Sequence, residues 1–93
     1  PIKRIGRARF IRNVLIAIGN SGDSTLAPVV RDRLKDDAPV VRAMAVWALS
    51  RLIPADEFSA LSAQTMGDEK DPDVIEEWNM ALQSDMKHSH ETK

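Results

Sequence analysis

The apolar residues of this chain recur every three or four positions, a spacing that predicts helices and no strand. The third of five such runs is apolar nearly all round, which is typical of a helix buried between neighbours. The runs lie at residues 9–20, 26–35, 40–52, 54–66 and 72–82. We therefore expect an all-α domain over residues 1–84, followed by a disordered polar tail over 85–93.

Start and stop signals separate these runs. Gly19 and Gly22 end the first helix, and Ser24 or Thr25 can cap the second. An Asp followed by an early Pro opens both the third helix, at Asp37-Ala38-Pro39, and the fifth, at Asp71-Pro72.

The helices repeat in pairs. Ile16-Ala17-Ile18-Gly19 aligns with Trp47-Ala48-Leu49-Ser50 at an offset of 31 residues, and Ala48-Leu49 aligns with Ala81-Leu82 at an offset of 33. A period of this length containing two helices predicts a HEAT-like α-solenoid of about two and a half helix pairs. A plain five-helix bundle is the alternative, but the repeated small Ala positions favour stacked pairs.

The formal net charge of −1 hides a gradient along the chain. Residues 1–20 carry five basic and no acidic side chains, whereas residues 54–93 carry three lysines and ten acidic side chains. A basic end can follow phosphates and an acidic end repels them. The basic stretch fits either a nucleic-acid contact or an acidic neighbouring domain.

The amino-acid composition excludes several kinds of site. The 93 residues contain no cysteine, so no disulfide and no cysteine-held zinc or iron–sulfur site can form within them. No apolar run approaches the ~18 residues of a membrane span. His88 and His90 alone make a weak metal site, and no catalytic constellation or phosphate-binding glycine loop is present.

The stretch from Leu26 to Leu49 closely resembles a HEAT-like repeat of the short bacterial type. Ahead of it, Arg12-Asn13 and Ile16-Ala17-Ile18-Gly19-Asn20 narrow the match. Together these segments resemble the C-terminal part of the epoxyqueuosine reductase family, over about residues 4–82.

This resemblance implies that the chain is a non-catalytic domain of an enzyme. The family reduces an epoxide on the modified wobble base of transfer RNA, the last step of queuosine synthesis. It uses cobalamin and two 4Fe–4S clusters held by other regions, and its HEAT-like domain helps to hold the transfer RNA. The resemblance thus implies a cytoplasmic, non-catalytic module that carries no cofactor and has no membrane contact. Its partners would be transfer RNA and the N-terminal catalytic domains of the same chain.

Helical geometry selects the residues expected to contact RNA. At 100° per residue with Arg4 at zero, the polar strip spans about 80° to 180° and the apolar residues span about 240° through 20°. Arg, Lys and Asn side chains on such a strip suit an RNA backbone. The strip contains Arg9, Arg12, Asn13 and Asn20, and Lys3 and Arg4 are basic groups just before it. The alternatives for this strip are a solvated face or a contact with another domain.

Other side chains have structural interpretations. Arg7 falls on the core side near the helix start and should hydrogen-bond a neighbouring element or lie in the preceding loop. Arg42 should pair with an acid of the adjacent inter-helix loop, such as Asp36 or Asp37. Trp47 and Trp78 can stack on bases, but their apolar surroundings predict core positions. Basic residues of the second helix extend the basic track or form an ordinary charged face; they are Arg31, Arg33 and Lys35.

The sequence is compatible with two other functions. A protein–protein scaffold of HEAT-like repeats, as in phycobilin lyase relatives, is the main alternative to transfer RNA binding. A self-standing helical enzyme is the other, and the missing catalytic constellation argues against it. Cluster motifs encoded upstream would favour the reductase.

Overall fold

A computed structural model describes the backbone of residues 2–91 and the side chains of residues 6–84. Within residues 2–91 every regular element is helical, which confirms the all-α prediction. The α-helices are α1 (Ile2–Ser21), α2 (Ala27–Asp32), α3 (Pro39–Leu52), α4 (Ala55–Thr65) and α5 (Pro72–Glu91). Short 3-10 turns at Ser24–Leu26, Arg33–Lys35 and Met66–Asp68 extend α2 and α4.

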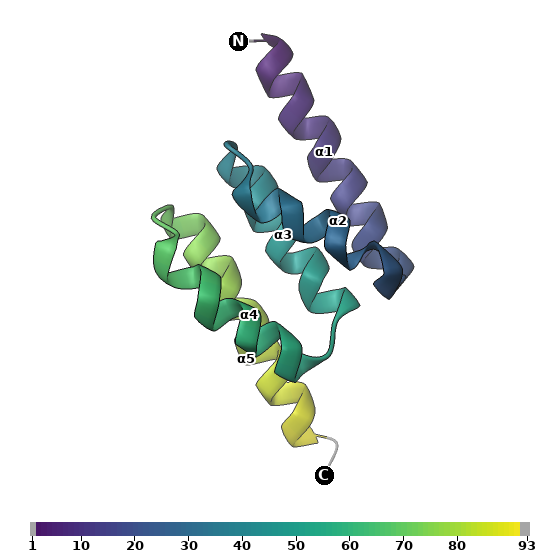
Figure 1. Cartoon of the computed structure of the whole chain (residues 1–93), viewed down its shortest axis with the longest axis vertical. Helices are drawn as coiled ribbons and strands as arrows, with labels where there is room; N and C mark the ends of the chain where they lie inside the picture. The colour runs from purple at the N-terminus through teal and green to yellow at the C-terminus, as the bar shows by residue number, and fades with distance from the viewer. Residues whose placement is uncertain (1, 92–93) are drawn as a thin grey trace.

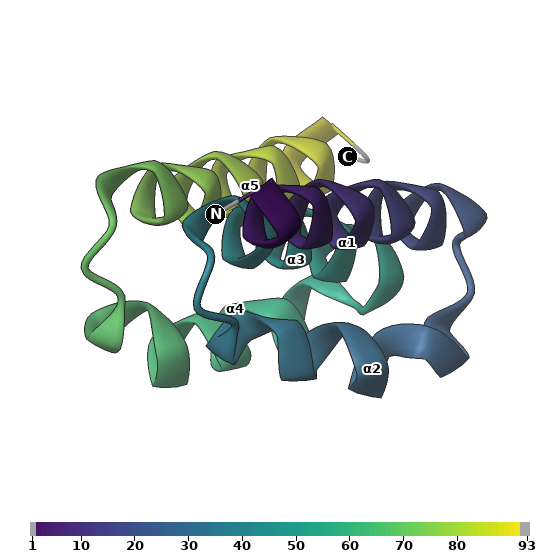
Figure 2. The same ribbon diagram turned by 90° about the horizontal axis from the view of Figure 1, so that it is seen from above.

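The helices form two layers. Helices α1, α3 and α5 lie side by side in one layer and run in the same direction, and α2 and α4 cover one face of that row (Figures 1 and 2). The whole measures 49 × 28 × 19 Å. This stacking of helix pairs confirms the α-solenoid expected from the repeat.

The core centres on α3, which contacts α1, α2, α4 and α5. Six of its side chains are buried, and they are Val41, Ala45, Val46, Ala48, Leu49 and Leu52. The repeat-equivalent alanines Ala48 and Ala81 are both buried, which supports the predicted alignment. The all-round apolar pattern of α3 thus reflects neighbours on several sides.

The helix boundaries follow local chemistry. Gly22 ends α1 in the left-handed region at φ 69°, where a side chain would be strained. Asp71 caps α5 by accepting hydrogen bonds from the backbone N–H groups of Asp73 and Val74, at 2.9 and 3.3 Å. At the second helix the capping side chain is Asp23 instead of the predicted Ser24 or Thr25.

Helix α1 differs from its prediction in two ways. It begins at Ile2, so Lys3 and Arg4 belong to the helix instead of preceding it. Phe10 and Val14 fall within the apolar arc predicted to face the core, but they are 69% and 39% exposed, whereas Leu15 of the same arc is buried. Because α1 lies at the end of its layer, only the part of its apolar arc that faces α3 and α2 is covered (Figure 2).

Helix α5 continues to Glu91, beyond the end expected near Ser84. The disorder of 85–93 stays a prediction, and the side chains of His88 and His90 lie outside the described residues.

We expect Trp78→Ala to be strongly destabilising. Trp78 is 1% exposed and its ring lies 5.2 Å from that of the buried Phe58. Removing it leaves a cavity and should lower the free energy of unfolding by about 3–5 kcal/mol. Urea unfolding followed by circular dichroism measures the change. The half-buried Trp47 is the control, since Trp47→Ala should cost less, and equal midpoints for the parent and Trp78→Ala would contradict this core.

Candidate nucleic-acid interface

The predicted RNA-contact residues whose side chains are described lie on one helix. Arg9 and Asn13 are exposed and Arg12 is partly buried, and Arg12 Nη1 donates a hydrogen bond to Asn13 Oδ1 at 3.2 Å. The side chains of Lys3 and Arg4 lie outside the described residues. The strip is therefore surface-accessible, although Arg12 borders α3 instead of lying opposite the core.

Two hollows mark the junction between α1 and α3. In the first, Arg9 and Arg12 line a space of about 390 Å³ with Ala8 and with Val40 of α3. The second, also about 390 Å³, is lined by Ile16, Asn20, Met44 and Trp47, with Glu77 of α5. Because the two helices run in parallel, the second hollow lies further along both of them, by about two turns of α1 and one to two turns of α3. We call the two hollows together the α1–α3 furrow.

Trp47 is partly buried and packs against the core, as predicted, but it also lines this furrow. One edge of its ring rests on Gly19, where a Cβ atom would come within 3.0 Å of Cη2 and 3.1 Å of Cε3. The exposed Arg51 lies over the ring, with its guanidinium carbon 5.7 Å from the centroid. The missing side chain of Gly19 thus allows the indole to lie against α1 while part of it stays accessible.

Sequence reasoning placed Asn20 on the polar strip but did not identify the furrow. The useful signal was the alignment of Ile16 with Trp47, because it gives both residues the same position in successive repeats. Nothing in the sequence indicated that Glu77 lines the furrow, since this residue comes from a third helix, α5. Its pKa is raised by burial and, to a smaller extent, by the neighbouring Glu76.

Arg7 forms an ion pair with a neighbouring element, the loop before α3, as predicted. Its two Nη atoms donate to the Asp36 carboxylate at 3.3 and 2.6 Å. Asp36 also accepts from the backbone N–H of Ala38 at 3.0 Å and pairs with Arg33 at 3.4 Å. Arg7 and Arg33 therefore hold the loop before α3.

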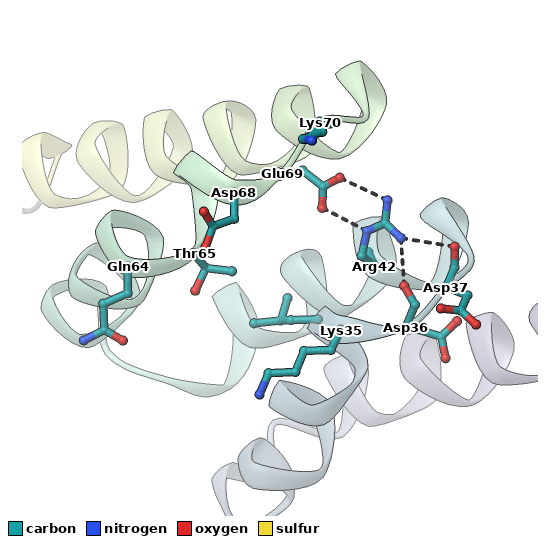
Figure 3. A pocket seen from close by; sticks show the side chains of 10 residues that line it. Lys35, Asp36, Asp37, Arg42, Gln64, Thr65, Asp68, Glu69 and Lys70 are labelled. Carbon is teal, nitrogen blue, oxygen red and sulfur yellow. Dashed lines mark hydrogen bonds and ion pairs between the residues drawn. The ribbon is translucent and has the colours of Figure 1, made fainter.

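Arg42 makes the corresponding contact one repeat later, but with a different acid from the one predicted. Its Nε and Nη2 donate to the Glu69 carboxylate at 2.9 and 3.0 Å (Figure 3). Its Nη1 donates to the backbone carbonyls of Asp36 and Asp37, at 2.7 and 3.2 Å, instead of to their carboxylates. The prediction located the correct loop but missed Glu69.

We call these two contacts, Arg7 with Asp36 and Arg42 with Glu69, the loop ties. In each tie an Arg of one helix binds the acid in the loop before the next helix of the same layer. That acid also accepts from a backbone N–H two residues on, from Ala38 in the first tie and from Asp71 at 3.0 Å in the second. The second tie borders a polar hollow of about 590 Å³ between the two loops.

The remaining basic candidates lie away from the furrow. Arg31 and Lys35 are exposed on α2 and the turn that follows it, in the second layer (Figure 2). They do not extend the strip of Arg9 and Arg12, and they therefore form a separate charged surface.

The described residues hold no group of three or more His, Asp or Glu side chains placed to bind a metal, and the chain has no cysteine. No helix within residues 2–91 is long and apolar enough to cross a membrane.

Comparison with known proteins agrees with this architecture. The profile of HEAT repeats matches residues 7–83, and the chain belongs to this family. A 52-residue stretch is 35% identical to an epoxyqueuosine reductase of Xanthomonas campestris pv. campestris. The match covers 55% of this chain and 15% of that protein, so the chain corresponds to a small part of its relative. No solved structure matches the chain.

The loop ties predict a loss of stability in acid. The hydrogen bonds from Arg7 hold the pKa of Asp36 below its usual 3.8. Burial alone would raise the pKa of Glu69, but Arg42 and the backbone N–H of Asp71 outweigh it and hold the value below 4.5. A lowered pKa in the folded state stabilises the fold above the unfolded-state pKa, so this contribution should fade as the pH falls below about 4.5.

Unfolding by urea between pH 3 and pH 7 tests the ties. Glu69→Gln should cost about 1.5–3 kcal/mol at pH 7, because the Arg42 guanidinium loses its anionic partner in a largely buried site. The same variant should also lose less stability than the parent on acidification. Asp56→Asn, an exposed carboxylate of α4, is the control. Parallel pH profiles for the parent and Glu69→Gln would rule out the tie as a source of acid sensitivity.

Proposed function

We propose that this HEAT-repeat chain is a non-catalytic module that holds transfer RNA for an epoxyqueuosine reductase. The observation that carries the proposal is the basic face of α1. Residues 1–20 have five basic side chains and no acid, and Arg9 and Arg12 border the furrow while Arg7 is engaged by Asp36. The similarity to a protein named epoxyqueuosine reductase supports the choice of RNA.

Arg9 and Arg12 are the proposed phosphate ligands, and Asn13 extends the same strip. Guanidinium groups bind phosphate through charge-assisted hydrogen bonds, and such contacts position a protein on an RNA backbone without reading its sequence. Lys3 and Arg4 belong to the same helix and would add to the positive field. Helix α3 lies between α1 and the acidic α5, so most of the negative charge of α5 is away from Arg9 and Arg12, and Glu77 meets the furrow only at its Trp47 end (Figure 1).

The chemistry would belong to other parts of the enzyme. In this proposal cobalamin and two 4Fe–4S clusters are bound by N-terminal catalytic domains of the same protein, in the cytoplasm. Without cysteine, this chain itself offers no cluster ligand of the usual kind. Its contribution to the reaction would be substrate affinity and orientation.

A protein–protein scaffold is the second candidate, because α1 also has an apolar flank. Phe10 and Val14 are 69% and 39% exposed, and they lie a quarter turn or more from the Arg9 and Arg12 side of the helix. Such a flank suits another helical element. It competes with RNA binding as the main role only if the basic strip has no affinity for RNA.

Charge reversal on α1 tests RNA binding. Arg9→Glu with Arg12→Glu should weaken binding of unmodified transfer RNA, because two phosphate contacts become repulsive. The slope of log affinity against log salt should flatten by about 1 for each lost contact. Folding should be retained, since Arg9 is exposed and Arg12 only partly buried. The measurement is a binding titration with this chain at several salt concentrations.

The matched control makes the same change of charge in the other layer. Arg31→Glu with Lys35→Glu should leave most of the affinity intact. If both double variants bind equally weakly, the effect is one of net charge. If neither differs from the parent, the α1 strip does not contact RNA and the scaffold becomes the better account.

A further inference from the structure

We propose that the Trp47 end of the α1–α3 furrow is a binding site for one unstacked RNA base, with Asn20 and Glu77 contacting the edge of that base. This proposal rests on the proposed RNA-binding function and adds a second kind of contact to it. The basic strip would hold the phosphates, and the furrow would hold a base.

The first argument is continuity. Arg9 and Arg12 meet α3 at Val40, and Ile16 and Asn20 meet it at Met44 and Trp47. Eight helical residues separate Arg12 from Asn20 and seven separate Val40 from Trp47, which correspond to about 10–12 Å, so the phosphate-binding end and the Trp47 end are roughly two nucleotides apart. A single strand whose phosphate lies against Arg12 can therefore place a base about two nucleotides further on beside Trp47.

The second argument is the state of Trp47. The two tryptophans differ in accessibility, because Trp78 is 1% exposed inside the core whereas Trp47 is partly buried and lines the hollow. Trp47 rests one edge on Gly19 and leaves part of its ring at the surface. Aromatic rings and Arg guanidinium planes are the groups on which proteins stack single-stranded bases, and the exposed Arg51 guanidinium lies over one face of this ring, so a base can stack on the guanidinium or replace it on the ring.

The third argument concerns the rim of the hollow. Ile16 and Met44 make its walls apolar, while Asn20 supplies an amide and Glu77 a carboxylate. A volume of about 390 Å³ lies within the range of ligand sites, about 300–1,000 Å³. A carboxylate accepts hydrogen bonds from the amino group of cytosine, and an Asn amide pairs with adenine. The site should thus prefer a base with an exocyclic amine over uracil.

The chemistry of Glu77 agrees with this preference. Burial raises its pKa, so its carboxylate is poorly hydrated and gains from a hydrogen-bond donor. A phosphate would be repelled there, which assigns the base, and not the backbone, to this end of the furrow.

The test compares hexacytidylate RNA with hexauridylate and with an abasic strand of the same length, all binding to the 93-residue chain. Hexacytidylate should quench the fluorescence of Trp47, and the abasic strand should bind through its phosphates without quenching. Trp78 is buried and acts as the internal reference. Trp47→Ala should weaken hexacytidylate roughly 5- to 150-fold, the range expected for one lost base stack, and should leave the abasic strand unaffected.

Two surface variants guard against a folding effect of Trp47→Ala. Asn20 is exposed and Glu77 only partly buried, so Asn20→Ala and Glu77→Gln should keep the parent circular dichroism. Both should reduce the preference for hexacytidylate over hexauridylate. Lys70→Ala, in the loop before α5, is the matched control and should change neither strand.

The outcomes separate this proposal from the one it rests on. Abasic binding with a normal salt slope, but no quenching and no effect of Trp47→Ala, would overturn the base site and keep the phosphate strip. Quenching that survives the Arg9 and Arg12 reversals would keep the base site and overturn the strip. No binding of any strand would overturn both and leave the furrow to a protein partner. Equal affinity for hexacytidylate and hexauridylate would overturn the assigned roles of Asn20 and Glu77.

Discussion

The pairing of an Arg with an acid in the following loop is the constraint on which the stack depends. Helices in a solenoid touch only their neighbours, so the spacing of one layer must be fixed between each pair. Arg7 and Arg42 fix it at one end, where each binds a loop carboxylate that also holds a backbone N–H. Along the remaining length, apolar contacts with α3 keep the helices together.

These ties also decide which positive charges are available to a ligand. Arg7 and Arg33 share Asp36 and Arg42 pairs with Glu69, so two of these three positive charges are balanced within the fold. Arg9 and Arg12 lie on the same helix as Arg7 but face the furrow. The distribution of partners, and not the number of basic residues alone, therefore gives α1 its basic face.

Much of the fold could be predicted because its signals are local. Apolar spacing, Gly22, Pro39 and Pro72 depend on a few neighbouring residues, and they indicated five helices and a repeat. The partner of Arg42 could not be predicted in this way, since Glu69 lies 27 residues away in the loop of the next repeat. The exposure of Phe10 was missed because helical spacing does not show which side of an end helix has a neighbour.

The candidate interface was predictable in part. The polar strip of α1 follows from spacing alone, and in the structure Arg9 and Asn13 are exposed whereas Arg12 is partly buried beside α3. Trp47 could not be assigned from its helix, because an all-round apolar pattern does not reveal that the contact on one side is a glycine. Gly19 was expected only to end a helix, whereas its missing side chain lets the indole lie against α1.

The repeat also has a consequence for the outer face of the α1, α3 and α5 row. Ile16, Trp47 and the 56%-exposed Met80 occupy equivalent positions in successive helices. Neighbouring helix axes are about 8–10 Å apart, so these three side chains are spaced at nearly regular intervals across the row. Side chains at regular intervals suit a ligand whose own groups repeat at a regular interval. Adding one helix pair to the array would add one such side chain. The length of the contact surface could therefore change in evolution while the existing positions stay the same.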